Sequence, residues 1–411
     1  MANKEPLAGT NATAGDNRGI TVRQWLPLIG LTCSAFVLNT SEFMPIGLLT
    51  DIADSFGLTE AATGIMITAY AWAVMLLSLP LMIAASRIEF KRLFLGVLSV
   101  FATGQVLSAL APTFPVLVLA RIVVACGHAV FWAIAPVMAS RLVDPRHGSI
   151  ALSLVATGSS IAMIFGLPIG RVIGLAVGWR MTFVVVGAIA AALVAYMAAV
   201  FPHMPAGEPF TLAKLPTLLR NRALVTLYAV TMLFATAYYT AYSYIEPFLQ
   251  QVAHVAPSDV TLILTALGVA GLVGSLLFSR LYDGHQLPFL AIAIGGVPAA
   301  LLLLRAASAS PATVTAACMA LGMCSTAFNV AFQAEVIDVA ERDASSVAMS
   351  IFSGLFNFGI GAGSALGGLV VTHLSLGDVG FVGGAIGAVG WLLAVTVFFR
   401  LLRARHTSAA F

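Results

Sequence analysis

The chain alternates long apolar runs with short polar segments. Each run is close to, or longer than, the roughly 20 apolar residues with which an α-helix crosses a membrane. Twelve such helices are predicted, at 25–50, 59–84, 93–111, 115–142, 149–173, 181–201, 223–250, 260–281, 287–304, 311–336, 345–374 and 377–401. Because these runs are too long for the strands of a membrane barrel, the pattern predicts an all-α membrane protein.

Composition and spacing divide the chain further. Of its 411 residues, 60% are hydrophobic and only 9% are charged, which is too little polar surface for a soluble protein. Six predicted helices lie on each side of one longer connection. We therefore expect a disordered cytoplasmic tail at 1–23, a six-helix bundle at 24–201, a cytoplasmic linker at 202–222, a second six-helix bundle at 223–402 and a cytoplasmic tail at 403–411.

Lysine and arginine in the loops predict the orientation, because these residues collect on the cytoplasmic side of a membrane. With both termini in the cytoplasm, the basic residues of both tails face inward, as do Arg87, Lys91, Arg92, Arg141, Arg146, Lys214, Arg220, Arg222, Arg280 and Arg342. Only Arg171, Arg180 and Arg305 then face outward. This bias accounts for the net charge of +3 without a nucleic-acid partner.

Internal similarity predicts that the two bundles are pseudo-symmetric, as in many transporters. Ala-Leu-Ser at 151–153 matches Ala-Met-Ser at 348–350, and a glycine-rich helix follows in each case. Glu42 with Pro45 in the first span is echoed by Glu246 with Pro247 in the seventh. The glycines either serve packing alone or form helix contacts that can rock during transport.

Charged residues inside the spans are candidates for function, since burying a charge in a membrane is costly. By helix geometry Glu42 lies about 12 Å and Arg121 about 9 Å below the outer surface. We expect the two to pair, with His128 beside them, and expect Asn39 and Trp132 on the same faces as substrate-binding residues. Glu42 is the candidate proton carrier, with His128 as a competing carrier or a substrate donor. The alternatives, in which these residues have only a structural role, are a static Glu42–Arg121 bridge and a neutral, packed His128.

A second candidate site lies in the C-terminal half. Four tyrosines fall within 238–244, and helical periodicity puts Tyr239, Tyr242 and Glu246 on one face. Aromatic rings can stack on a sugar while polar side chains bind its hydroxyl groups. The predicted substrate wall consists of this face and the amides Asn329, Gln333 and Asn357. Alternatively, the tyrosines form only an aromatic belt at the membrane surface.

Four segments carry a resemblance to a known family: 39–49 (NTSEFMPIGLL), 125–132 (ACGHAVFW), 239–248 (YTAYSYIEPF) and 352–357 (FSGLFN). The chain resembles the SotB-type sugar efflux transporters of bacteria over nearly its full length. These transporters belong to the drug:proton antiporter branch of the major facilitator superfamily. The resemblance implies a proton-driven exporter of arabinose, thiogalactosides and other sugars in the inner membrane.

Three residues are assigned to gating from partial matches to superfamily motifs. Pro168 and Gly170 resemble the antiporter motif of span five, although the proline is one place late and Arg171 stands where a small residue is usual. Asp283 keeps the acid expected after span eight. The equivalent loop after span two, at 85–92, keeps only the basic end of its motif.

Two other classes of function are weighed against sugar export. A multidrug or nucleoside antiporter would have the same helices, and only its substrates would differ. An enzyme is disfavoured, because no catalytic triad, metal cluster or phosphate-binding loop stands at either mouth. The four cysteines all lie in spans and suggest neither disulfides nor a metal site. We expect a monomer in the lipid bilayer that binds a small sugar and protons and needs no cofactor or metal.

Overall fold

Twelve long helices form the protein in a computed structural model that describes residues 20–85, 87–144, 147–206, 215–282, 284–340 and 345–409. The structure has twelve helical segments long and apolar enough to cross a membrane, as predicted. The N-terminal half comprises α1 (Val22–Phe43), η1 (Met44–Leu48), α2 (Leu49–Phe56), α3 (Glu60–Thr63), α4 (Ile65–Ala85), α5 (Phe90–Leu110), α6 (Phe114–Arg141), α7 (Gly148–Val177) and α8 (Trp179–Val200). The C-terminal half comprises α10 (Arg222–Tyr242), α11 (Ile245–Pro247), η4 (Phe248–Val252), α12 (Pro257–Leu281), α13 (Gln286–Ala307), α14 (Pro311–Val339), α15 (Ser345–His373), η5 (Leu376–Asp378), α16 (Val379–Leu393), η6 (Ala394–Phe398) and α17 (Phe399–Ala409).

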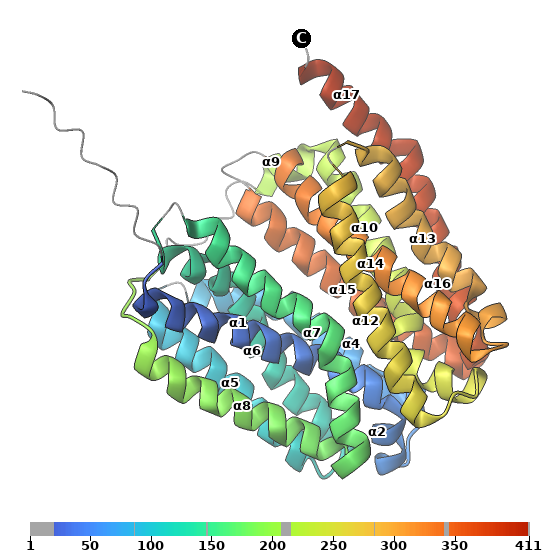
Figure 1. Cartoon of the computed structure of the whole chain (residues 1–411), viewed down its shortest axis with the longest axis horizontal. Helices are drawn as coiled ribbons and strands as arrows, with labels where there is room; N and C mark the ends of the chain where they lie inside the picture. The colour runs from blue at the N-terminus through green and yellow to red at the C-terminus, as the bar shows by residue number, and fades with distance from the viewer. Residues whose placement is uncertain are drawn as a thin grey trace, which may run out of the picture.

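The two halves lie side by side as separate bundles (Figure 1). Large apolar side chains cover the outside of both, for example Leu76 at 63%, Leu262 at 68% and Ile292 at 69% exposure. Such a surface is unfavourable in water but suits contact with lipid. The polar side chains of the candidate site lie in the interior.

The connection between the halves contains a short helix, α9 (Leu215–Arg220). His203 and Met204 lie at the start of this connection. Glu89, in the α4–α5 loop, accepts hydrogen bonds from the His203 ring at 2.9 Å and from the Met204 amide at 3.3 Å. The His203 bond lowers the pKa of the Glu89 carboxyl. The start of the connection is thereby attached to the N-terminal half. We call this end of the molecule the linker end and the opposite end the far end.

Local sequence explains where several helices begin and end. Proline occupies the first position of α12 and α14, where its missing N–H leaves no hydrogen bond unmade. Asn221 caps α10 by accepting from the amides of Ala223 and Leu224. Gly57 ends α2 in the left-handed conformation, with φ of 64°, which glycine adopts without strain.

The first and seventh spans are interrupted, although each was predicted as one continuous helix. After Phe43 the chain forms a 3-10 turn around Pro45, and α2 then completes the span. After Tyr242 a turn at Ser243 and Tyr244 leads into α11 and the π-helix η4. Both interruptions fall at the repeated glutamate and proline, and broken helices of this kind often border transporter binding sites.

The repeat is visible in helix packing. Helix α7 lies against α1, where a Cβ on Gly166 would come within 2.8 Å of the Thr40 hydroxyl. Helix α15 lies against α10 in the same way, where a Cβ on Gly363 would come within 2.5 Å of the Thr236 carbonyl. Gly363 follows Gly166 at the 197-residue spacing of the repeat. Glycine is required at both positions because the partner backbones approach so closely.

The halves meet in the middle and at the far end of the molecule. Trp72 of α4 stacks on Phe358 of α15, with ring centroids 6.4 Å apart. Between the same helices the Thr68 hydroxyl donates to the Gly361 carbonyl at 3.2 Å. Nearer the far end, Gln251 of η4 contacts Glu60 of α3. In this conformation the far end is therefore closed.

Candidate functional site

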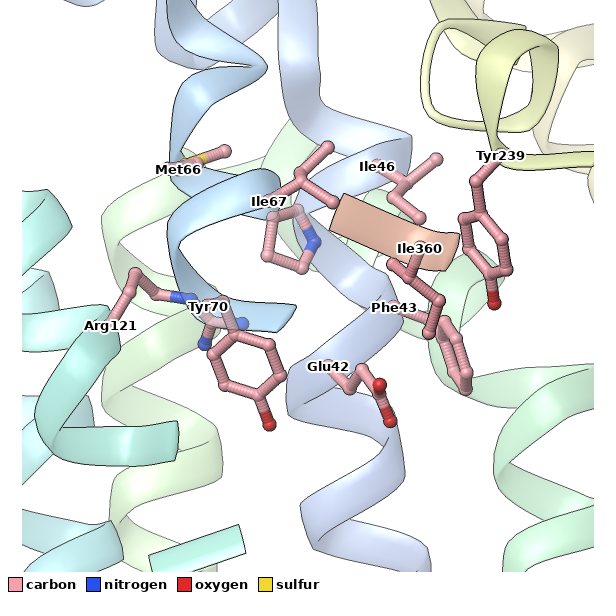
Figure 2. Close-up of a pocket in the computed structure, with 10 residues that line it drawn as sticks. Glu42, Phe43, Ile46, Met66, Ile67, Tyr70, Arg121, Tyr239 and Ile360 are labelled. Atoms are coloured by element: carbon pink, nitrogen blue, oxygen red, sulfur yellow. The ribbon is translucent and has the colours of Figure 1, made fainter. Parts of the chain in front are cut away.

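A small pocket lies between the halves, beside the break in the first span (Figure 2). Its wall is mostly apolar, with two charged residues and two tyrosines. The lining residues are Glu42, Phe43, Pro45, Ile46, Met66, Ile67, Tyr70, Arg121, Tyr239 and Ile360. Eight of the ten come from α1, η1, α4 and α6 of the N-terminal half, whereas Tyr239 and Ile360 belong to α10 and α15.

Arg121 does not form the predicted ion pair with Glu42 among the residues that the structure describes. Its guanidinium donates instead to the hydroxyl of Ser41 at 3.1 Å and to the Ser41 carbonyl at 3.0 Å. It also lies over the ring of Tyr70, 4.4 Å from the centroid. Figure 2 shows the Tyr70 ring between Arg121 and Glu42. The prediction was wrong because it compared only depth in the membrane and ignored Ser41, the residue before Glu42, which offers Arg121 two acceptors.

Glu42 lies beside His128. The His128 Nε2 atom lies 3.7 Å from a Glu42 carboxylate oxygen, beyond ordinary hydrogen-bond distance. The His128 side chain is 5% exposed and that of Glu42 12%. Both are therefore in the interior, where a charge without a close counter-charge is costly. Glu42 and His128 lie together, as predicted for the proton-coupling cluster.

Asn39 and Trp132, the predicted substrate-binding residues of the N-terminal half, lie behind the pocket. The Asn39 amide donates to the hydroxyl of Ser159 on α7, so it joins two helices of the N-terminal half. The Trp132 ring packs on the rings of His128 and Phe131, at centroid distances of 6.3 and 5.3 Å. Neither Asn39 nor Trp132 lines the pocket in this conformation.

The tyrosines of span seven are buried, which is not the arrangement of an aromatic belt. Tyr238, Tyr239, Tyr242 and Tyr244 are at most 9% exposed. Tyr239 lines the pocket, and its ring lies edge-on to Tyr242 at 5.7 Å. Tyr242 instead stacks on Tyr238 at 4.8 Å. Of the predicted tyrosine wall, the pocket contains Tyr239.

The predicted amides lie in the C-terminal half but do not line the pocket. Gln333 donates to Asn329 along α14, so these two side chains bind each other. Asn357 on α15 donates to the Ser353 carbonyl at 3.0 Å. Its buried Oδ1 atom accepts no hydrogen bond from the described part of the chain. Asn357 therefore retains an acceptor that a ligand could use.

Glu246 does not share a helical face with Tyr239 and Tyr242 and does not line the pocket. Its carboxylate is fully buried and forms an ion pair of 2.9 Å with Arg171 of α7, in the other half of the molecule. The predicted common face with Tyr239 and Tyr242 assumed one continuous helix. Because α10 ends at Tyr242, the helical periodicity does not extend to Glu246. Arg171, expected to face outward, is likewise fully buried.

The predicted gating residues have different outcomes. Pro168 lies within α7, and Gly170 packs so closely that a Cβ there would come within 2.7 Å of Met44 in η1. Asp283 lies outside the residues that the structure describes. Helix α7 thus contacts the broken segment of the first span directly beside Arg171.

Three polar residues that the sequence analysis passed over belong to this cluster. Ser41 holds Arg121, and Gln105 donates to the same Ser41 hydroxyl from α5. Tyr70 faces the pocket, and its buried hydroxyl has no hydrogen-bond partner in the described part of the chain. Each is a polar side chain inside a predicted span, and that signal could have identified them.

The pocket combines an acid that can exchange a proton with a fixed positive charge. Arg121 is held by Ser41, so Glu42 can gain or lose a proton without breaking a direct ion pair. Because both halves contribute to the wall, rearrangement of the halves would change the surroundings of Glu42. These are the two requirements for coupling protonation to transport.

Comparison with known proteins gives a consistent picture. The family model of the Major Facilitator Superfamily matches residues 31–284 and 227–410. A probable sugar efflux transporter of Mannheimia succiniciproducens is 40% identical over 388 residues, covering 94% of this chain and 98% of that protein. A bacterial homologue of the human lysosomal transporter Spinster, in an inward-facing and occupied conformation, has a TM-score of 0.71 at 17% identity, covering 95% of this chain and 98% of that one. The nucleoside transporter NupG has a TM-score of 0.74 at 14% identity, covering 92% of this chain and 99% of that one. The last two likenesses concern the fold alone.

Proposed function

This chain belongs to the Major Facilitator Superfamily, and on that basis we propose that it exports small sugars, such as arabinose and thiogalactosides, in exchange for protons. It is a multi-pass membrane transporter and not an enzyme. The similarity to a probable sugar efflux transporter along nearly the whole chain supports sugar as the cargo. We further propose the SotB type within the drug:proton antiporter branch, a monomer in the inner membrane, and cytoplasmic termini, which makes the linker end the inner side.

Glu42 is the proposed proton carrier, and its position in the pocket is the observation that carries the coupling proposal. The carboxylate faces the space between the halves, and its positive neighbour Arg121 is bound to Ser41. A sugar in the pocket would exclude water and change the cost of a charge at Glu42. Proton release and sugar binding can thereby compete. His128, at 3.7 Å, is placed to share the proton.

The proposed sugar site is built from both halves. Tyr70 and Tyr239 offer aromatic faces and hydroxyl groups in the pocket. Asn357 of α15 lies outside the pocket in this conformation and would offer its unused Oδ1 atom once the halves move. Asn39, Trp132, Tyr242, Asn329 and Gln333 form the surrounding layer and would reach the sugar after the halves move. Pro168 and Gly170 are proposed to guide that movement through the contact of α7 with η1.

The test is transport of radiolabelled arabinose in proteoliposomes with an imposed pH gradient. Wild-type protein should accumulate sugar on the acidic side. Glu42→Gln has nearly the same shape without a titrating group, so it should bind arabinose with wild-type affinity and lose uphill transport. Glu89→Gln is the matched control outside the spans and should keep both properties. Uphill transport by Glu42→Gln at the wild-type rate would remove Glu42 from the coupling mechanism.

Competition distinguishes the sugar proposal from nucleoside or multidrug export. Unlabelled arabinose or a thiogalactoside in excess should abolish the labelled signal, while nucleosides and lipophilic cations should leave it unchanged. Absence of arabinose transport, or loss of the labelled signal with nucleosides, would replace the sugar by another cargo, and the Glu42→Gln measurement would then be made with that cargo.

A further inference from the structure

We propose that Arg171 and Glu246 form the gate that closes the far end of the transporter, and that their ion pair must separate each time the protein opens on that side. The proposal goes beyond the choice of cargo or coupling ion. It requires only that transport proceeds by alternate opening of the two ends, the mode in which such halves rock about a central site.

The ion pair joins elements that must move apart. Arg171 comes from α7 of the N-terminal half and Glu246 from α11 of the C-terminal half. The nitrogen–oxygen distance is 2.9 Å, and both side chains are fully buried. A structural ion pair within one bundle would survive transport unchanged. This pair cannot, because the interface it spans is the one that opens.

Both oxygens of the Glu246 carboxylate accept hydrogen bonds in the closed state. One oxygen accepts from Arg171 and from Gln250. The other accepts from the hydroxyl of Thr50 at 2.8 Å and from the Thr50 backbone amide at 3.2 Å. Thr50 lies in the first turn of α2, where backbone amides and the helix dipole favour an anion. Donors from both halves thus converge on one carboxylate.

Arg171 also binds backbone carbonyls of both halves beside Glu246. Its guanidinium donates to the Gly47 carbonyl in η1 and lies 3.5 Å from the Pro257 carbonyl at the start of α12. It therefore connects the broken segment of the first span to the C-terminal half. The breaks in the first and seventh spans, at η1 and α11, both end at this ion pair. Opening the far end would separate η1, α2 and α7 of the N-terminal half from α11 and α12 of the C-terminal half here.

The energetics predict an asymmetric response to mutation. A buried ion pair contributes little net stability, but removing one partner leaves a buried, unpaired charge at a cost of several kcal/mol. Arg171→Gln would leave Glu246 unpaired only while the far end stays closed, since opening admits water. The single substitution should therefore favour the open state. Removing both charges should restore closure, because no unpaired charge then remains.

The experiment measures the opening directly. Spin labels on Asp54→Cys in α2 and Ser258→Cys in α12 report the spacing across the far end by double electron–electron resonance, in a background without the four native cysteines. Both positions are exposed. We expect Arg171→Gln to raise the ratio of long to short distances at least about tenfold, corresponding to about 1.4 kcal/mol. Glu246→Gln should have a smaller effect, because Arg171 keeps its carbonyl acceptors.

Two comparisons make the result specific. The double variant Arg171→Gln with Glu246→Gln should return the distances toward those of the wild type. Arg305→Gln is the matched control, since it breaks an ion pair with Asp378 at the same end but within one half. It should leave the distances unchanged. Unchanged distances in Arg171→Gln, or equal opening in Arg305→Gln, would overturn the proposal.

A second measurement covers the case in which Arg171→Gln does not fold. Glu60 and Gln251 contact each other across the same end. Glu60→Cys with Gln251→Cys, joined by a short thiol cross-linker, should abolish transport, and cleaving the linker should restore it. Transport at the uncross-linked rate would show that the far end need not open. Neither measurement depends on whether Glu42 carries the proton.

Discussion

Glu42 and Glu246 occupy similar sequence contexts, each followed by a proline at a break in a span, yet their surroundings differ. Glu42 faces a pocket and lies 3.7 Å from His128. Glu246 is enclosed by donors from two halves. Burial alone therefore does not assign a role to an acid. The number of donors that bind its carboxylate separates an acid that can exchange protons from one held in a fixed contact.

Tyr70→Phe tests whether the unused hydroxyl in the pocket binds substrate. The ring that supports Arg121 remains, and an unpaired buried hydroxyl contributes no stability, so the melting temperature should stay the same or rise. Loss of a hydrogen bond to sugar should lower affinity by roughly 5- to 150-fold. Isothermal titration with arabinose measures this. Tyr196→Phe, whose hydroxyl donates to the Leu26 carbonyl away from the pocket, should change affinity little, and equal losses in both variants would contradict the assignment.

At this scale the sequence predicted which residue types matter better than it predicted their partners. Glu42, Arg121 and His128 were identified because charged or titratable residues inside spans are rare. The wrong Glu42–Arg121 pair came from comparing depths, which cannot detect a nearer acceptor such as Ser41. Partner choice depends on distances of a few ångströms between helices, and a sequence does not contain them.

At the scale of elements, the close helix contacts of the two halves repeat one another. Helix α7 lies on α1 through Gly166, and α15 lies on α10 through Gly363. Such contacts between glycine and backbone have no adjustable side chain. A larger residue therefore cannot be accommodated by a change of rotamer, and a whole helix must move.

Gly363→Ala should consequently destabilise the C-terminal bundle. The added Cβ would lie 2.5 Å from the Thr236 carbonyl and 2.9 Å from the Thr240 amide, and both are backbone atoms. We expect a loss of about 1–3 kcal/mol, as for other overpacked sites, visible as a lower melting temperature in detergent. Gly354→Ala on the same helix is the control, because nothing lies within 4 Å of its Cβ. A larger loss at Gly354 than at Gly363 would refute this account of the packing.

Element boundaries were predictable where hydrophobicity ends, and less so where geometry changes inside an apolar run. The caps and prolines of α10, α12 and α14 leave a clear signal. The break after Tyr242 leaves no such signal, because Tyr244 and Ile245 continue the aromatic and apolar run after Ser243. Glu246 was misassigned for that reason alone. The available sign of a break was Pro247 directly after Glu246, but the sequence analysis uses this pair only as evidence of the repeat.

At the scale of the whole molecule, the pocket depends on both halves, so a bound sugar should hold them together. Arabinose at about 100 times its dissociation constant should stabilise the folded transporter by about 2.7 kcal/mol. The melting temperature in detergent, measured across a series of arabinose concentrations, tests this. A nucleoside at the same concentrations is the control and should give no shift. A shift with the nucleoside and none with sugars would favour the alternative cargo.

The number and class of the spans followed from composition and run length, because a membrane permits few folds. The contacts that join the two halves at the far end could not be predicted from composition and run length. The sequence predicts Arg171 as an outward-facing residue and as an exception to a small-residue motif, and its partner lies 75 residues away in the other half. Contacts between rigid bodies are set by their relative position, which short motifs do not describe.

The two copies of the repeat differ at the place where Arg171 stands. At the 197-residue spacing its counterpart is Gly368, where an added Cβ would meet the Tyr244 hydroxyl at 2.8 Å and the Ala61 carbonyl at 3.3 Å. Only the first of these two positions has room for a guanidinium. At the second, Tyr244 and the Ala61 backbone occupy the space that a side chain would need. The two copies therefore cannot exchange this residue, and a single Gly368→Arg substitution would not create a second ion pair of the same kind.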